Sequence, residues 1–141
     1  MKIAVRYYSR SGNTKKVAEA IAAELGVEAK DVSEPLGEGV DNLFLGSALY
    51  AGGVDESIKK FIEENSASIG IIYNFGTAAS PANTYKKVKK IADGIGVKIA
   101  EEEFHCKGKF LFLHGKHPNE SDLKNAREFA RGVLKKINHE E

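Results

Sequence analysis

The chain of 141 residues is 42% hydrophobic and 29% charged, and its formal net charge is +1 at pH 7. This length predicts a single domain, residues 1–141, built around one core, and the ordinary composition argues against disorder. A charge so close to zero creates no strong field, so we expect neither nucleic acid nor a membrane surface as a partner.

Cysteine usage and the amino terminus favour a reducing compartment. The one cysteine, Cys106, cannot form a disulfide within the chain, and without a second thiol we expect it to be inert. The first residues lack the charged and long apolar segments of a secretory signal, and no window reaches eighteen apolar residues. We therefore expect a cytoplasmic protein without a membrane span, present as a monomer or a weak dimer.

Strands and helices are predicted to alternate from the amino terminus. Ile3–Val5 is a short apolar strand, and the helix that follows has apolar residues at helical spacing and ends at Gly26. Residues 27–32 form a weak second strand and residues 42–49 a more apolar third one, with no obvious helix between them. Asp55 is then placed to cap a short helix.

The middle of the chain continues this alternation. Residues 69–75 are predicted to form a central strand. Ser80-Pro81 is expected to start a helix, because proline suits the first helical position, and Gly94 and Gly96 are expected to end it. Residues 97–104 alternate in polarity, which predicts an edge-like fifth strand.

The carboxyl-terminal segment ends in a helix. Residues 110–113 are apolar and extend or resume the fifth strand. Asn119, with Asp122 three residues later, has the spacing of a capping box. The helix that it opens has one apolar stripe, which is Leu123, Ala126, Phe129, Ala130, Val133, Leu134 and Ile137.

This order of elements predicts an α/β fold with a doubly wound, five-stranded parallel sheet and helices on both faces. In such a sheet, ligands bind outside the carboxyl ends of the strands, near the point where the strand order reverses. The loops that leave the first, third and fourth strands are therefore the candidate site. They read "SRSGNT", "ALYAGG" and "FGTAAS", and each is rich in small residues.

The first of these loops, residues 9–14, has the groups needed to bind a phosphate. The hydroxyls of Ser9, Ser11 and Thr14 and the amides at the start of the next helix donate toward one place, and Gly12 permits a close turn. An ordinary helix cap is the alternative interpretation. Neither the nucleoside triphosphate loop nor the dinucleotide fingerprint is present, so the anion is expected to be a terminal monophosphate.

At these positions the sequence resembles the flavodoxin family, whose phosphate loop reads T/S-x-T/S-G-N-T directly after the first strand. "SRSGNT" fits that pattern at every position, and it lies between a predicted strand and a predicted helix. The resemblance extends over nearly the whole chain. "LGSALYAGG" falls where the family places a ring-stacking aromatic, and "NFGTAASP" falls where it covers the other face of the ring.

The resemblance implies noncovalent binding of FMN, with Tyr50 stacked on the flavin and no side chain acting as an acid or base. A surface loop residue is the alternative interpretation of Tyr50. The family often carries an acidic residue and a tyrosine where Ala79, Ser80 and Pro81 stand here, so a second stacking partner is missing or supplied elsewhere. The implied cofactor-binding residues are Ser9, Arg10, Ser11, Gly12, Asn13, Thr14, Ala48, Leu49, Tyr50, Ala51, Gly52, Asn74, Phe75, Gly76, Thr77, Ala78 and Ala79.

Three functions remain open at this point. The first, implied by the resemblance, is one-electron transfer between redox partner proteins. The second is an FMN-dependent reductase of quinones or nitro compounds that uses NAD(P)H, and the third is a binding module of this fold without flavin. No metal site is expected, because His105, His114 and His117 lack a convincing ligand spacing.

Overall fold

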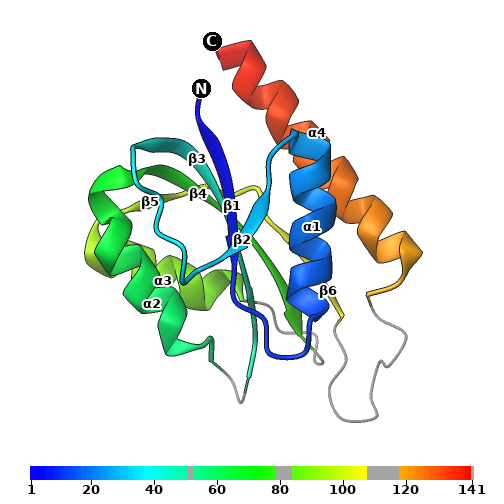
Figure 1. Cartoon of the computed structure of the whole chain (residues 1–141), viewed down its shortest axis with the longest axis horizontal. Helices are drawn as coiled ribbons and strands as arrows, with labels where there is room; N and C mark the ends of the chain where they lie inside the picture. The colour runs from blue at the N-terminus through cyan, green and yellow to red at the C-terminus, as the bar shows by residue number, and fades with distance from the viewer. Residues whose placement is uncertain (51–52, 79–83, 108–117, 141) are drawn as a thin grey trace.

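The computed structural model describes residues 1–50, 53–78, 84–107 and 118–140 (Figure 1). Its strands are β1 (Ile3–Tyr7), β2 (Ala29–Asp31), β3 (Val40–Ala48), β4 (Ile69–Ala78), β5 (Lys98–Ile99) and β6 (Phe104–Lys107). Its helices are α1 (Asn13–Leu25), α2 (Glu56–Asn65), α3 (Tyr85–Ile95) and α4 (Glu120–Glu140), with a short 3-10 helix, η1, at Ser66–Ser68.

The strands form one parallel sheet in the order β2-β1-β3-β4-β5, and β6 also pairs with β4. Helices α1 and α4 cover one face, and α2 and α3 cover the other (Figure 1). The strand order reverses between β1 and β3, because the chain goes from β1 outward to β2 and then returns. The predicted doubly wound α/β fold is confirmed.

Each face of the sheet carries its own core. On the α1 and α4 face, Phe44 and Phe75 pack with Val17 and Ala130. On the α2 and α3 face, Leu45 and Ile72 belong to a second cluster with residues of both helices. Full burial of such a side chain contributes about 1.5–3 kcal/mol, so these two clusters hold the helices against the sheet.

The helix ends confirm three sequence signals. Gly26 follows α1 in the left-handed conformation with φ of 72°. The carboxylate of Asp55 accepts a hydrogen bond from the Ser57 backbone N–H at 3.0 Å at the start of α2. Asn119 and Asp122 exchange reciprocal hydrogen bonds of 2.9 Å, as a capping box requires.

A close approach between two strands requires glycine at position 46. A Cβ atom built on Gly46 would lie 2.1 Å from Cε2 of Phe75, far inside van der Waals contact. The Phe75 ring therefore lies across Gly46 on the neighbouring strand, and β4 continues as a strand through Ala78. The predicted strand over residues 69–75 is confirmed but too short, because residues 76–78, expected in the loop, continue it.

The fifth strand is divided, which corrects the prediction of one strand over residues 97–104. β5 pairs with β4 at Ile71 and Ile72, and β6 pairs with it from Phe75 onward. Between the two lie Ala100 and Glu101–Glu103, and Glu102 forms an ion pair with Lys136 of α4. Consecutive carboxylates remain solvated or paired more easily than they enter a sheet ladder. Residues 110–113 lie outside the described residues.

Helix α3 is described over Tyr85–Ile95, and the expected start at Ser80-Pro81 lies outside the described residues. Gly96 ends the helix with φ of 94°, as predicted, whereas Gly94 lies within it. Of the predicted inward residues, Val88 and Ala92 are buried, and Ile91 and Ile95 pack against the same cluster. The apolar spacing therefore located the buried face correctly.

The connection between β2 and β3 contains no helix, in agreement with the sequence. A buried arginine on β1 fixes it instead. The Arg6 guanidinium donates to the carbonyls of Glu34 at 3.0 Å, Pro35 at 3.1 Å and its neighbour Val5 at 3.1 Å. Burial lowers the pKa of Arg6, and Glu34 and Glu28 oppose that effect. In the part of the chain that the structure describes, no helix is long and apolar enough to span a bilayer.

Candidate functional site

The carboxyl ends of β1, β3 and β4 meet at one edge of the sheet, the lower edge in Figure 1, where α1 also begins. The backbone continues this alignment past the strands. Tyr8 N–H donates to the carbonyl of Gly46 at 3.1 Å, and Leu49 N–H donates to that of Thr77 at 3.0 Å. The three segments expected to form the site therefore start side by side.

The first loop leads into α1 without a conventional cap. Gly12 is the N-cap residue with φ of 89°, and no side chain caps the helix at this position. The hydroxyl of Ser9 accepts from the Gly12 N–H at 2.9 Å, so it shapes the loop and does not cap the first helical turn. The interpretation of these residues as an ordinary helix cap therefore does not match the geometry.

The electrostatics of this helix end favour an anion. The first amides of any helix have no acceptor within it, and they carry the positive end of the helix dipole. The first turn of α1 contains no acidic residue. Helix α3 also has no acidic residue in its first turn, whereas α2 has Asp55 as its N-cap and Glu56 in its first turn, and α4 has Glu120 and Asp122.

The Thr14 side chain at the start of α1 faces β4. Asn13 and Thr14 are both buried, and the hydroxyls of Thr14 and Thr77 are 2.9 Å apart. Thr77 also lies directly opposite Ala48 in the β3–β4 ladder. The start of α1, the end of β3 and the end of β4 are thus connected through neighbouring residues.

Tyr50 lies at a tight reversal after β3. Its N–H donates to the carbonyl of Gly53 at 2.7 Å, and the Gly53 N–H donates back to the Tyr50 carbonyl at 2.9 Å. Ala51 and Gly52, which were expected to line the flavin, lie between these two residues and outside the described ranges. The reciprocal bonds hold Tyr50 and Gly53 directly opposite each other.

Arg10 connects the first loop with this reversal. Its guanidinium carbon is 4.0 Å from the centroid of the Tyr50 ring, and its backbone N–H donates to the Tyr50 hydroxyl at 3.2 Å. The same guanidinium donates to Oδ1 of Asp55 at 3.0 Å. One face of the Tyr50 ring is therefore covered by a cation that a carboxylate holds in place.

This cluster changes the acidity of its members. The hydrogen bond from the Ser57 backbone N–H is the largest cause that lowers the pKa of Asp55, and Arg10 lowers it further. The hydrogen bond to Asp55 raises the pKa of Arg10. Burial raises the pKa of Tyr50. Asp55, Arg10 and Tyr50 are thus held as a carboxylate, a cation and a neutral phenol.

The residues predicted on β4 divide between the two faces of the sheet. Phe75 is fully buried in the α1 and α4 core, whereas the amide nitrogen of Asn74 donates to the Thr84 hydroxyl at 3.0 Å on the opposite face. The structure therefore does not bring these two side chains to the open edge. Gly76, Thr77 and Ala78 lie nearer the end of the strand, and Ala79 lies outside the described residues.

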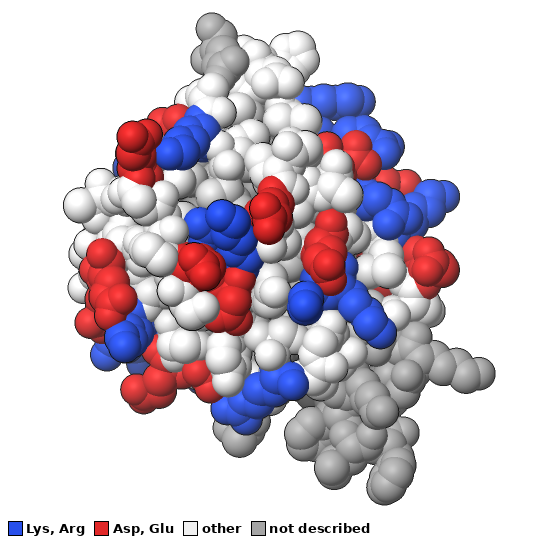
Figure 2. All heavy atoms as spheres, viewed as in Figure 1, with Lys and Arg blue, Asp and Glu red and all other residues white. Residues whose placement is uncertain are grey.

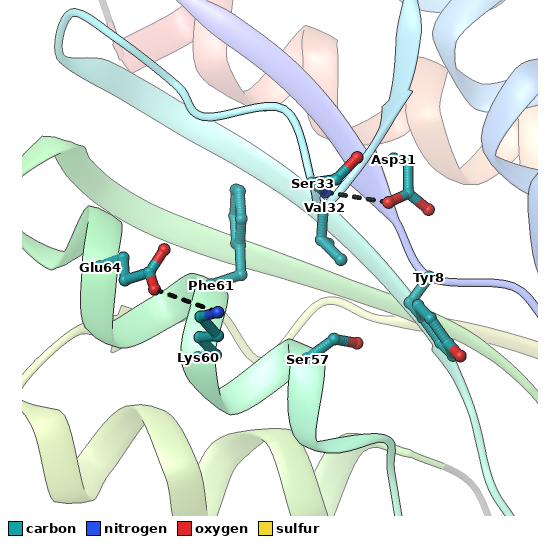
Figure 3. Close-up of a pocket in the computed structure, with 8 residues that line it drawn as sticks. All are labelled: Tyr8, Asp31, Val32, Ser33, Ser57, Lys60, Phe61 and Glu64. Carbon is teal, nitrogen blue, oxygen red and sulfur yellow. Dashed lines mark hydrogen bonds and ion pairs between the residues drawn. The ribbon is translucent and has the colours of Figure 1, made fainter.

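A hollow of about 430 Å³ lies beside the site, on the face covered by α2 (Figure 3). It is bounded by Tyr8, Val32 and Phe61, next to the connection that lacks a helix. In its lining, Asp31 accepts a hydrogen bond from the Ser33 N–H at 2.9 Å, and Lys60 forms an ion pair with Glu64 at 3.8 Å. None of the residues expected to bind a cofactor lines it, so it is separate from the candidate site.

Sequence reasoning missed the long-range partners of the site residues. Asp55 was predicted as a helix cap, but no local pattern indicates its ion pair with Arg10. Thr84 was also missed, although it is fully buried and bonds to Asn74. Among the described residues, no group of three or more His, Cys, Asp or Glu side chains is arranged to hold a metal ion.

Comparison with known proteins gives a consistent result. A family model described as "Flavodoxin domain" matches residues 4–112. An uncharacterized protein of Methanocaldococcus jannaschii is 34% identical over 149 aligned positions, which cover 96% of this chain and 99% of that protein.

Solved structures share the fold. A flavodoxin from the domain Archaea superposes with a TM-score of 0.79 at 20% identity, covering 99% of this chain and all of that one. A flavoprotein from Lactobacillus acidophilus NCFM, solved in complex with FMN, superposes with a TM-score of 0.62 at 20% identity. That match covers 75% of this chain and 92% of the flavoprotein.

Proposed function

The chain belongs to the flavodoxin family, and from this premise we propose that it binds FMN noncovalently and carries electrons between redox partner proteins. The observation that carries the proposal is the uncapped start of α1, placed at the carboxyl edge of the sheet beside the ends of β3 and β4. This is the place where doubly wound sheets bind their ligands.

The residues of the first loop fit a phosphate. Gly12 with its positive φ brings the backbone close, and the first turn of α1 has no carboxylate to repel a dianion. We assign Ser9, Ser11, Asn13 and Thr14 to this group, with backbone amides supplying further donors. Arg10 adds little net charge here because Asp55 is paired with it.

The flavin ring is assigned to the segments after β3 and β4. Ala48–Gly52, with Tyr50 as the stacking aromatic, and Gly76, Ala78 and Ala79 would line it. Phe75 and Thr77 are not assigned to the ring, because the Phe75 side chain is buried in the α1 and α4 core and the Thr77 hydroxyl pairs with Thr14. Arg10 lies against one face of Tyr50, so the ring of the flavin would stack on the other face. An aromatic stack of this kind contributes about 0.5–1.5 kcal/mol beyond the area that it buries.

The flavin supplies the redox chemistry when it is bound, and the protein supplies binding and orientation. No side chain in the proposed site is assigned a role as acid or base. Figure 2 shows positive and negative side chains interspersed on the face in view, in keeping with the net charge of +1. We therefore expect docking of partners to depend little on ionic strength.

The test begins with the absorbance spectrum of the protein as isolated, followed by addition of FMN. The proposal predicts a bound yellow chromophore whose spectrum differs from that of FMN in buffer. A protein that stays colourless after addition and removal of excess FMN would indicate a binding module without flavin.

A kinetic assay separates the carrier from an enzyme. The loaded protein is incubated at micromolar concentration with NADPH or NADH and a quinone. The electron-carrier proposal predicts no multiple turnover under these conditions. Sustained oxidation of the nicotinamide would instead favour the FMN-dependent reductase.

A further inference from the structure

Two buried threonines join the proposed phosphate site to the strand beneath the proposed ring site. Thr14 lies in the first turn of α1, and Thr77 lies near the end of β4, 63 residues later, yet their hydroxyl oxygens are 2.9 Å apart. The two residues are only 1% and 3% exposed. Their hydrogen bond is thus shielded from water.

The chemistry of hydroxyl groups gives this pair a direction. Each hydroxyl has one hydrogen to donate and two lone pairs that accept. The hydrogen bond between the two threonines uses the hydrogen of one hydroxyl, and the hydrogen of the other hydroxyl remains free to donate elsewhere. If Thr14 donates, its hydrogen points toward β4, whereas if Thr77 donates, the hydrogen of Thr14 is available to an anion at the start of α1.

We propose that Thr77 is a positioning residue for the phosphate site. The Thr77 hydroxyl donates to the Thr14 hydroxyl and so directs the Thr14 hydroxyl hydrogen toward the bound anion. This inference rests on the proposed function. A hydroxyl that accepts a hydrogen bond becomes a better donor, and the effect is larger where water is excluded. Thr77 therefore strengthens a contact that it does not make itself.

The position of Thr77 supports this role. Its backbone is fixed on both sides, because it lies opposite Ala48 on β3 and opposite Cys106 on β6. Its carbonyl accepts from the Leu49 N–H at 3.0 Å. A hydroxyl on so constrained a backbone can hold Thr14 in one orientation with little further loss of entropy.

The test compares FMN with riboflavin, which lacks only the terminal phosphate, in wild type, Thr77→Val and Thr77→Ser. Thr77→Val is expected to weaken FMN binding about five- to tenfold, as for one hydrogen bond, and to leave riboflavin binding unchanged. Thr77→Ser restores the hydroxyl and is expected to restore FMN affinity.

Thr84→Val is the matched control, because it also removes a fully buried threonine hydroxyl, one that bonds to Asn74 on the other face of the sheet. It is expected to leave the ratio of the two affinities at the wild-type value. A second readout needs no flavin. Inorganic phosphate is expected to raise the melting temperature of wild type more than that of Thr77→Val.

Equal losses of FMN and riboflavin affinity in Thr77→Val, or no loss of either, would overturn the assignment of Thr77 while leaving the proposed function in place. A Thr77→Ser variant that binds FMN as weakly as Thr77→Val would overturn it too. If the wild type binds neither ligand, the proposed function fails and this inference fails with it.

Discussion

Replacing Asp55 with alanine and with asparagine separates two roles of this carboxylate. Asp55 caps α2 through the Ser57 backbone N–H at 3.0 Å and pairs with Arg10 at 3.0 Å. Alanine removes both interactions. Asparagine is as good an N-cap as aspartate, so it removes only the charge that holds Arg10 against Tyr50.

The two variants should differ measurably in stability. Loss of an N-cap costs about 1 kcal/mol. The ion pair is partly solvated, with 54% of the Arg10 side chain and 21% of the Asp55 side chain exposed, so it contributes about 0.2–1 kcal/mol. We therefore expect Asp55→Ala to lower the free energy of unfolding by about 1–2 kcal/mol and Asp55→Asn by less than about 1 kcal/mol.

The measurement is urea denaturation at pH 7, with Glu63→Gln as the matched control. Glu63 is on the same helix and pairs with Lys59 at 3.9 Å, but it caps nothing, so this substitution is expected to change stability by less than about 0.5 kcal/mol. If Asp55→Asn destabilised the protein as much as Asp55→Ala does, the separate contribution of the cap would be refuted. If Asp55→Ala left the free energy of unfolding unchanged, both contributions would be refuted.

The pH dependence has a defined sign. The pKa of Asp55 is lowered in the folded state, first by the Ser57 N–H and then by Arg10. Its stabilising effect is therefore complete above the unfolded value of about 3.9 and is lost as the pH falls through the lower folded value. The difference between wild type and Asp55→Ala should stay constant from pH 7 to about pH 5 and shrink below about pH 4.

Three further predictions concern Arg6 and Cys106. Arg6→Met removes three hydrogen bonds to carbonyl groups, including those of Glu34 and Pro35, and is expected to lower the free energy of unfolding by about 2–4 kcal/mol. Urea denaturation measures this, and a methionine variant as stable as wild type would show that burial of the charge cancels the hydrogen bonds. Burial raises the pKa of Cys106 to about 12, so alkylation of the folded protein by iodoacetamide at pH 8 should be at least about a hundredfold slower than in urea. Stability should also fall as the pH rises above about 8.5, where the unfolded thiol begins to ionise, and equal alkylation rates in folded and unfolded protein would contradict this.

Features that depend on neighbouring residues were predictable from the sequence. The glycine after α1, the carboxylate cap of α2 and the Asn119–Asp122 box each involve residues within a few positions of one another. The alternation of apolar segments was enough to predict the doubly wound sheet. The strand-loop-helix context of residues 9–14 was equally local, and the structure places that loop at the predicted edge of the sheet.

Features that join distant residues were not predictable. Arg10 contacts Tyr50 across 40 positions, and Thr14 contacts Thr77 across 63. Neither contact leaves a periodic signal, because each depends on how the ends of separate strands align. The division of the fifth strand was missed for a related reason. Pairing with β4 favours a continuous strand, whereas the charges of Glu101–Glu103 favour solvent, and the sequence pattern does not show which effect prevails.

Titration of FMN with the flavin-free protein tests whether the chain binds FMN noncovalently. FMN fluorescence is followed at micromolar concentration while protein is added. If the ring stacks on Tyr50 and the phosphate binds at the start of α1, as proposed, we expect progressive quenching that ends at one protein per flavin. Fluorescence that stays at the value of FMN in buffer throughout the titration would contradict it.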